Sequence, residues 1–271
     1  MALGLFLAAL PAAADPVHID GQAQQGGLMM GQAPGASEVR LDGEPVMVSD
    51  DGRFLFAFGR DSTQPAVVEV LLADGTRWQG EFTPEPREFD IQRIDGLPDH
   101  QVTPPPEVQE RIREDNRLIG QARRRRDARS DWREGFIWPL IGPVTGVYGS
   151  QRILNGQPRN PHWGIDIAAP VGTPVRAPAP GLVTLAHPDM YYSGGTLFVD
   201  HGHGLVSAFL HLDSILVETG QRVDQGEIIG RVGATGRVTG PHLDWRMNLG
   251  SVRIDPALLL DWETNPHADA R

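Results

Sequence analysis

Apolar and polar residues alternate through most of the N-terminal third of the chain, which is the period-2 pattern of strands with one buried face. The alternating apolar positions include Val39, Leu41, Phe54, Phe56, Phe58, Val68, Val70 and Leu72. Asp-Gly pairs at 42–43, 51–52 and 74–75 lie between these runs and are typical of tight hairpin turns. Residues 15–97 are therefore predicted to form a small antiparallel β-sandwich.

The pattern changes after this region. Three consecutive prolines, Pro104–Pro106, interrupt the strand pattern. Apolar residues then recur at helical spacing between residues 107 and 133. We therefore expect residues 98–133 to form a Pro-rich and helical linker. Four arginines, Arg123–Arg126, lie within the predicted helix, either as a solvated helix face or in contact with an anionic polymer such as the cell wall.

Residues 134–271 again have a β-rich pattern. Short apolar runs such as Gly181–Val183 and Gly226–Gly230 are bounded by turn residues, and no long helical pattern is present. This region is predicted to be a compact, mostly antiparallel β domain. The expected fold class is thus mostly β, with an N-terminal sandwich, an Arg-rich helical linker and a C-terminal β domain.

Composition narrows the possible functions of the 271-residue chain. Its net charge of -11 argues against a general nucleic-acid binder. The chain has no Cys, which excludes a thiol nucleophile, a Cys-ligated metal and a disulfide. Histidine and carboxylate side chains remain as candidate metal ligands.

The N-terminus resembles an export signal. Ala2–Leu10 is apolar and is followed by small residues, among which Ala12 and Ala14 fit the A-x-A cleavage rule. We expect a signal peptide over residues 1–14 and a mature chain beginning at Asp15, although no Lys or Arg precedes the apolar run. The alternative is a first core strand. No apolar run is long enough to span a bilayer, so we expect an exported protein without a transmembrane segment, periplasmic or associated with the cell wall.

Histidine and aspartate pairs recur in the C-terminal region. His162 and Asp166 are four residues apart, and His242 and Asp244 are two apart, so either pair on a strand would share one face. His211 ends another alternating run. Each pair alone occurs often by chance. Together, two imidazoles and two carboxylates near one point fit a hydrolytic metal site that keeps a position open for water.

Three blocks around these residues resemble a known family. The first runs His162-x-Gly-Ile-Asp166, the second includes His201-Gly-His-Gly and Phe209-Leu-His211-Leu, and the third ends in Thr239-Gly-Pro-His242-Leu. In this order they resemble the signatures of the lysostaphin-like peptidases, the LytM or M23 family of zinc metallopeptidases. The resemblance covers residues 138–256 and leaves out the predicted sandwich.

The resemblance implies a role for each matching residue. His162 and Asp166 would bind one zinc ion, while His211 and His242 would activate water or stabilise the oxyanion. The family's third ligand is a second histidine in the last block, and this chain has Asp244 there. A carboxylate binds zinc at about the distance of an imidazole, yet it would make the site more anionic and favour a harder metal such as manganese. The alternative for Asp244 is a pair with Arg246 or exposure to solvent.

The function that follows is an exported, metal-dependent DD-endopeptidase that hydrolyses the stem-peptide cross-links of bacterial peptidoglycan. Because no H-E-x-x-H motif supplies a glutamate base, His211 or His242 must take the proton, and the sequence does not distinguish them. The competing hypothesis is a catalytically weakened M23-like protein that binds the wall or regulates an amidase, with a cell-wall amidase or division proteins as partners. A carbohydrate-acting enzyme is disfavoured, since no carboxylate pair has an acid/base context.

Overall fold

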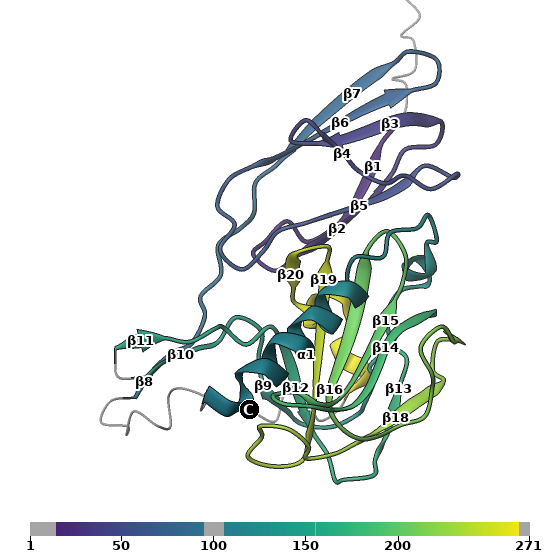
Figure 1. Cartoon of the computed structure of the whole chain (residues 1–271). Helices are drawn as coiled ribbons and strands as arrows, with labels where there is room; N and C mark the ends of the chain where they lie inside the picture. The colour runs from purple at the N-terminus through teal and green to yellow at the C-terminus, as the bar shows by residue number, and fades with distance from the viewer. Residues whose placement is uncertain (1–14, 95–105, 155, 266–271) are drawn as a thin grey trace, which may run out of the picture.

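The computed structural model describes residues 15–94, 106–154 and 156–265 (Figure 1). The predicted signal peptide and much of the Pro-rich segment lie outside these residues. Among the helices of the described residues, none is long and apolar enough to cross a membrane. The expected mostly β class is confirmed.

The N-terminal region contains two antiparallel sheets. One has the order β1-β2-β5 and the other the order β4-β3-β6-β7. Their strands are β1 (His18–Gly21), β2 (Leu28–Gln32), β3 (Ala36–Leu41), β4 (Glu44–Pro45), β5 (Arg53–Ala57), β6 (Ala66–Leu72) and β7 (Arg77–Phe82). Phe54 and Phe56 of one sheet and Val68 and Val70 of the other share an apolar core, as their alternation predicts.

The sheet formed by β1, β2 and β5 also has an apolar outer face. Leu28 and Leu55 point away from the N-terminal core and are buried in the core of the C-terminal domain. Beyond β7, Arg87 Nη2 donates a hydrogen bond to Asp255 Oδ2 at 2.9 Å. This sheet therefore lies between the other N-terminal sheet and the C-terminal domain and packs against both, as Figure 1 shows.

The helical segment is shorter than the sequence suggests. A 3-10 turn, η2 (Pro106–Val108), leads into α1 (Gln109–Ala122), and a second turn, η3 (Asp131–Glu134), follows. Arg123 is the C-cap of α1, so the expectation that Arg123–Arg126 lie within a helix is wrong. The apolar residues of α1 that pack on the sheet are Leu118, Ile119 and Ala122. The five residues that follow Ala122, Arg123–Asp127, are all charged, so the packing that stabilises a helix in a protein ends there.

The C-terminal domain is built on one large antiparallel sheet. The path of this sheet runs β17-β14-β15-β16-β19-β12-β9, with β18 joining β13 to β16 and β20 pairing with β19. Its strands are β9 (Val144–Gly146), β12 (Gly164–Ala168), β13 (Pro174–Arg176), β14 (Gly181–Met190), β15 (Gly194–Asp200), β16 (Leu205–Ile215), β17 (Arg222–Val223), β18 (Ile228–Val232), β19 (His242–Leu249) and β20 (Val252–Ile254). The predicted antiparallel β domain is confirmed.

Short elements complete the domain. Two 3-10 turns, η4 (Pro256–Leu259) and η5 (Trp262–Thr264), follow β20. At the edge of the domain, β8 (Ile91–Ile94) pairs in parallel with β10 (Gln151–Leu154), which also pairs with β11 (Gln157–Pro158). Strand β8, which follows the N-terminal sheets in the sequence, is therefore held to the C-terminal half of the chain by its pairing with β10.

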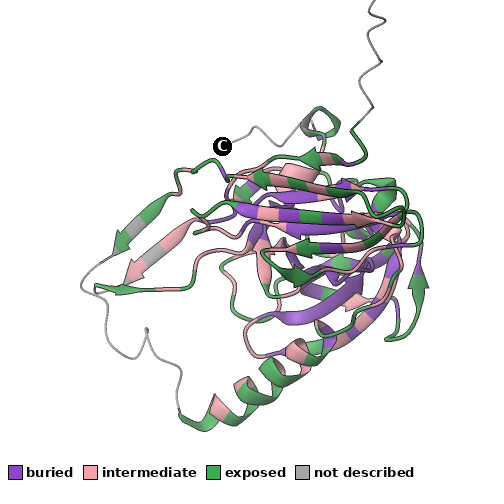
Figure 2. Ribbon diagram, turned by 90° about the horizontal axis from the view of Figure 1, so that it is seen from above, coloured by how far each residue is buried: buried purple, intermediate pink, exposed green. Residues whose placement is uncertain are grey.

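The central strands of the large sheet are buried on both faces, as Figure 2 shows. Leu197 and Phe209 point into the main core, which also receives Leu28 and Leu55. Phe198 and Ala208, one position away on the same strands, point to the other face and pack against α1. Helix α1 thus covers part of one face, and the N-terminal sheet belongs to the opposite core (Figures 1 and 2).

A buried histidine anchors the turn between β15 and β16. His201 is fully buried, and its Nδ1 lies 2.7 Å from the carbonyl oxygen of Pro180. Because a carbonyl only accepts, Nδ1 donates this bond, and the Ser207 hydroxyl donates to Nε2 at 2.8 Å. Burial lowers the pKa of His201 to about 4. The imidazole is therefore neutral in the folded protein near neutral pH.

This burial makes stability depend on pH. Between an unfolded pKa of about 6.5 and the folded value, only the unfolded state binds the proton, so His201 lowers the free energy of unfolding by about 1.4 kcal/mol per pH unit as pH falls. The free energy of unfolding, measured by urea unfolding at several pH values, should fall less steeply with decreasing pH for His201→Asn than for the wild type. The exposed-residue variant His18→Gln should keep the wild-type slope. Equal slopes for all three proteins would contradict the assignment.

Candidate functional site

The pairing register of β12 and β19 brings the predicted residues together. Asp166 lies opposite Asp244, and Ala168 lies opposite His242. Directly opposite residues of antiparallel strands project to the same face. Asp166, Asp244 and His242 therefore share one face of the sheet. It is the face that α1 partly covers, because Leu210, which packs toward α1, pairs with Asp244.

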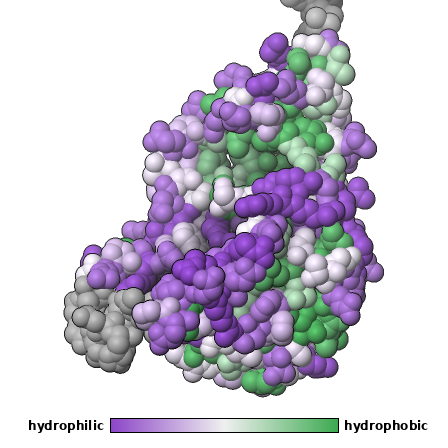
Figure 3. Space-filling model, in the orientation of Figure 1, coloured by the Kyte–Doolittle hydropathy of each residue, from purple (hydrophilic) through white to green (hydrophobic). Residues whose placement is uncertain are grey.

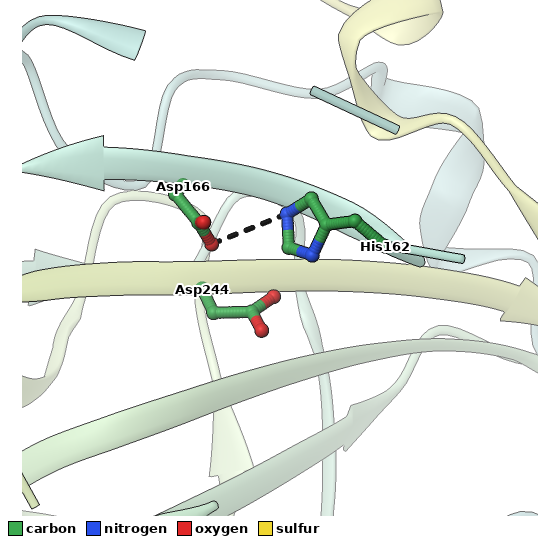
Figure 4. A group of neighbouring side chains, drawn as sticks. All are labelled: His162, Asp166 and Asp244. Carbon is green, nitrogen blue, oxygen red and sulfur yellow. Dashed lines mark ion pairs between the residues drawn. The ribbon is translucent and has the colours of Figure 1, made fainter. Parts of the chain in front are cut away.

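His162 reaches this face from a loop. It precedes the first residue of β12, so its position does not follow from strand alternation, which was the basis of the prediction. Its backbone N–H donates to the carbonyl of Ser150 at 2.8 Å, which fixes the approach of the loop. His162 Nε2 then lies 3.2 Å from Asp166 Oδ1, as Figure 4 shows.

Three side chains are arranged as metal ligands would be. His162, Asp166 and Asp244 each offer a ligand atom, and these atoms lie within 4.8 Å of one another (Figure 4). Apart from this ion-pair contact between them, His162 Nε2 and Asp166 Oδ1 are buried and make no hydrogen bond within the described part of the chain. Buried polar atoms without partners are costly. A divalent cation between these atoms would satisfy them, so the residues fit a zinc site with one imidazole and two carboxylate ligands.

The two carboxylates also act on the imidazole of His162. Burial lowers the pKa of His162, but the interaction with Asp166 and the charge of Asp244 outweigh it, and the net pKa is raised. A metal ion at this position competes with that proton, because a ligating histidine must be neutral.

A β-bulge directs His211 toward the site. Between the pairs Leu197–Phe209 and Gly195–Leu212, two residues of β16 lie opposite one residue of β15. His211, in this bulge, has a φ of 65°, a left-handed conformation that is uncommon for residues other than glycine. Its ring centroid lies 5.0 Å from that of His242. The irregularity therefore places two imidazoles side by side, which alternation alone would not do.

Carbonyl groups fix the tautomers of both imidazoles. His211 Nδ1 lies 2.9 Å from the carbonyl oxygen of Thr235, and His242 Nδ1 lies 2.9 Å from that of Gly240. Each Nδ1 donates, so each neutral ring carries its free lone pair on Nε2. His211 Nε2 lies 4.0 Å from Asp244 Oδ2, and His242 Nε2 lies 3.8 Å from Asp166 Oδ1.

The protonation of His211 suits a general base. Burial lowers its pKa below the usual value, against the raising effect of Asp244. The ring is therefore neutral near neutral pH and can accept a proton at Nε2. The sequence indicated both histidines but not the carbonyls of Thr235 and Gly240 that orient them.

Asp244 also forms an ion pair with Arg246. Arg246 Nε lies 2.9 Å from Oδ1 and 3.0 Å from Oδ2, and Nη2 lies 2.5 Å from Oδ2. Burial would raise the pKa of Asp244, but the charge of Arg246 outweighs it and holds the pKa below the usual value. Both sequence-based interpretations of Asp244 therefore describe part of the structure, since it lies with the candidate ligands and pairs with Arg246.

A glycine on the neighbouring strand makes room for this arginine. Gly164 lies opposite Arg246, and a Cβ on Gly164 would come within 2.7 Å of Arg246 Cγ. The positive guanidinium offsets the extra negative charge that Asp244 brings in place of a histidine. The local charge of the candidate site is then that of a site with two histidines and one aspartate.

The five predicted residues, His162, Asp166, His211, His242 and Asp244, all meet in this one site. The other histidines of the second block do not, because His201 and His203 lie in the turn between β15 and β16.

Comparison with known proteins identifies the C-terminal domain. Residues 160–256 match the family described as Peptidase family M23. This stretch includes β12, β16 and β19 and therefore all five site residues.

Two curated relatives match parts of the same region. Peptidoglycan DD-endopeptidase ShyA of Vibrio cholerae is 45% identical over 89 residues, which are 32% of this chain and 20% of the relative. Cell division protein DipM of Caulobacter vibrioides is 39% identical over 131 residues, which are 46% of this chain and 21% of that protein. The matched segments thus span about a fifth of the length of these relatives.

A solved structure extends the similarity to most of the chain. A crystal structure assigned to peptidase M23 from Pseudomonas aeruginosa has a TM-score of 0.66 and 30% sequence identity. The match covers 88% of this chain and 95% of that one. A match of this extent includes the N-terminal half as well as residues 160–256. The chain belongs to peptidase family M23.

Proposed function

We propose that this protein is a zinc-dependent endopeptidase that hydrolyses peptide cross-links in bacterial peptidoglycan. The observation that carries the proposal is the convergence of three ligand atoms within 4.8 Å, beside two imidazoles whose Nε2 atoms lie 4.0 and 3.8 Å from the two carboxylates. The similarity to ShyA, a peptidoglycan DD-endopeptidase, supports this substrate class. In this proposal His162, Asp166 and Asp244 hold the metal, and His211 and His242 carry the proton chemistry.

The bound zinc would supply a Lewis acid that polarises the scissile carbonyl and lowers the pKa of a water molecule. His211, kept neutral by burial, accepts the proton of the attacking water at Nε2. His242 lies beside His211 and donates a hydrogen bond from Nε2 to the developing oxyanion when it is protonated. The carbonyls of Thr235 and Gly240 hold the two rings in the orientation that these steps need.

One observation favours the second candidate, an M23-like protein with weakened catalysis that binds the wall or regulates an amidase. Arg246 already satisfies both carboxylate oxygens of Asp244. If this pair persists in solution, Arg246 competes with the metal for Asp244. Measurement of metal binding distinguishes the two functions.

We also propose that the protein acts outside the cytoplasm, in the periplasm or at the cell wall, where peptidoglycan lies. The apolar run and A-x-A end of residues 1–14 support export. N-terminal sequencing of the protein recovered outside the cytoplasm should begin at Asp15. Retention of Met1 on that protein would contradict the export signal.

Metal binding tests the role of Asp244. Asp244→Ala should weaken zinc binding by at least the factor of about 10–100 that changes beside ligands produce, as measured by competition with a chromogenic chelator. Asp189→Ala, which removes an exposed carboxylate paired with Arg111, is the matched control and should bind zinc as the wild type does. Wild-type affinity in Asp244→Ala would mean that Asp244 serves only Arg246, and would favour the second candidate.

The same zinc-binding assay tests whether Arg246 acts on the metal site independently of Asp244. Asp244→His alone leaves Arg246 partly buried without its carboxylate and beside the metal, so its zinc affinity should be lower than that of Asp244→His combined with Arg246→Gln. If the two variants bind zinc equally, Arg246 does not act on the metal site.

Hydrolysis tests the reaction. Defined muropeptide dimers incubated with the purified full chain should yield monomers by mass spectrometry, and a chelator should abolish the cleavage. His211→Ala should retain zinc but lower the rate by a factor of about 10²–10⁴, the usual contribution of a general base. His187→Ala, a histidine outside the site, is the control. Cleavage that survives complete removal of the metal would contradict the mechanism.

A further inference from the structure

A cationic hollow lies at the C-terminal end of α1, where the helix meets the turn between β19 and β20. Its volume is about 610 Å³, and it is lined by Gly120, Arg123, Arg124, Arg126, Gly250, Ser251 and Arg253. Four of these residues are arginines and none is acidic, in a chain whose net charge is -11. Figure 3 shows hydrophilic side chains gathered over α1 on this side of the molecule.

The guanidinium groups in the hollow lack carboxylate partners. Within the residues that the structure describes, no ion pair involves Arg123, Arg124, Arg126 or Arg253. Arg126 donates to backbone carbonyls, and Arg123 Nε is buried without any hydrogen bond. A buried donor without an acceptor destabilises the fold unless a ligand supplies one.

The arginines just beyond the hollow behave differently. Arg125 and Arg129 both pair with Asp127, at 2.8 and 2.9 Å. Acidic partners are therefore available in this segment, and the hollow is where they are missing. The cations there also act on one another. Burial and the charges of Arg253 and Arg246 lower the pKa of Arg123 to about 9.

We propose that this hollow is a binding site for an oxyanion, a phosphate or carboxylate group, distinct from the metal-binding residues. Guanidinium groups bind both oxyanions through paired N–H donors. The Ser251 hydroxyl supplies a further donor at the rim. A bound anion would accept hydrogen bonds from the arginine side chains that line the hollow and would offset the repulsion among them.

The position of the hollow separates it from the catalytic residues. Arg253 lies opposite Asn248 of β19, four residues beyond Asp244, which is roughly 13 Å of extended strand. The site therefore does not depend on the proposed peptidase activity. The sequence left two interpretations of Arg123–Arg126, a solvated helix face and contact with an anionic polymer such as the cell wall. An oxyanion site at Arg123, Arg124 and Arg126 agrees better with the second.

Inorganic phosphate is the first probe. The unfolding midpoint of the wild-type full chain should rise with phosphate concentration at neutral pH, with ionic strength held constant by chloride. The rise should be lost in Arg253→Gln and in Arg123→Gln. It should persist in Arg113→Gln, the matched control, because Arg113 is an exposed arginine of α1 paired with Glu110. Phosphate held at the metal-binding residues would raise the midpoint of every variant alike.

Two results would overturn the proposal: no phosphate-dependent rise in the wild type, or the same rise in Arg253→Gln as in the wild type. If the Arg253→Gln and Arg123→Gln variants, which change half-buried residues, fail to fold, Arg124→Gln replaces an exposed member of the hollow and should reduce the rise. A second arm identifies the source of the oxyanion. A stem peptide with free carboxylates is added to the phosphate-bound wild type and compared with its amidated form. Displacement of phosphate by the free carboxylate form alone identifies the ligand as a peptide carboxylate. If phosphate stays bound, the ligand is one that carries a phosphate group.

Discussion

The antiparallel register of β12, β19 and β16 is the constraint on which the candidate site depends. Asp166 pairs with Asp244, and Asp244 pairs with Leu210, the residue before His211. A slip of one residue between β12 and β19 would turn Asp166 toward the main core and leave a carboxylate among apolar side chains. The alternation of Leu243 and Trp245 on the other face prevents that slip, because both are fully buried. Core packing and site geometry are thus fixed by the same hydrogen bonds.

Much of this architecture could be predicted from the alternation and spacing of residues in the sequence. Alternation predicted the strands around Phe54 and Phe56, and spacing brought His242 and Asp244 to one face. His162 was placed with Asp166 by an argument from strand period, although a loop delivers it. His211 needed a bulge and a positive φ, which depend on pairing with a distant strand and leave no local pattern. The end of α1 at Ala122 was missed because helical propensity continues through the arginines, while the packing surface does not.

Arg246 shows how the candidate site keeps its net charge although one candidate ligand position holds aspartate in place of histidine. Aspartate in place of histidine adds a negative charge beside the metal position, and a guanidinium two residues along the strand offsets it. The arginine fits because Gly164 on the adjacent strand has no side chain. The residues at positions 164, 244 and 246 therefore depend on one another. Replacing Asp244 alone by the family's histidine would leave Arg246 without its carboxylate partner.

The outer face of the N-terminal sheet has a consequence for how sequence changes spread through the molecule. Leu28 and Leu55 belong to the same core as Trp245, and β5 contacts β19. Strand β19 carries Asp244 on its opposite face. Substitutions in the core of the N-terminal half therefore act on β19, and through it on the candidate site, by packing alone. The evolutionary freedom of the two halves is linked, and substitutions at their shared core must be tolerated by both.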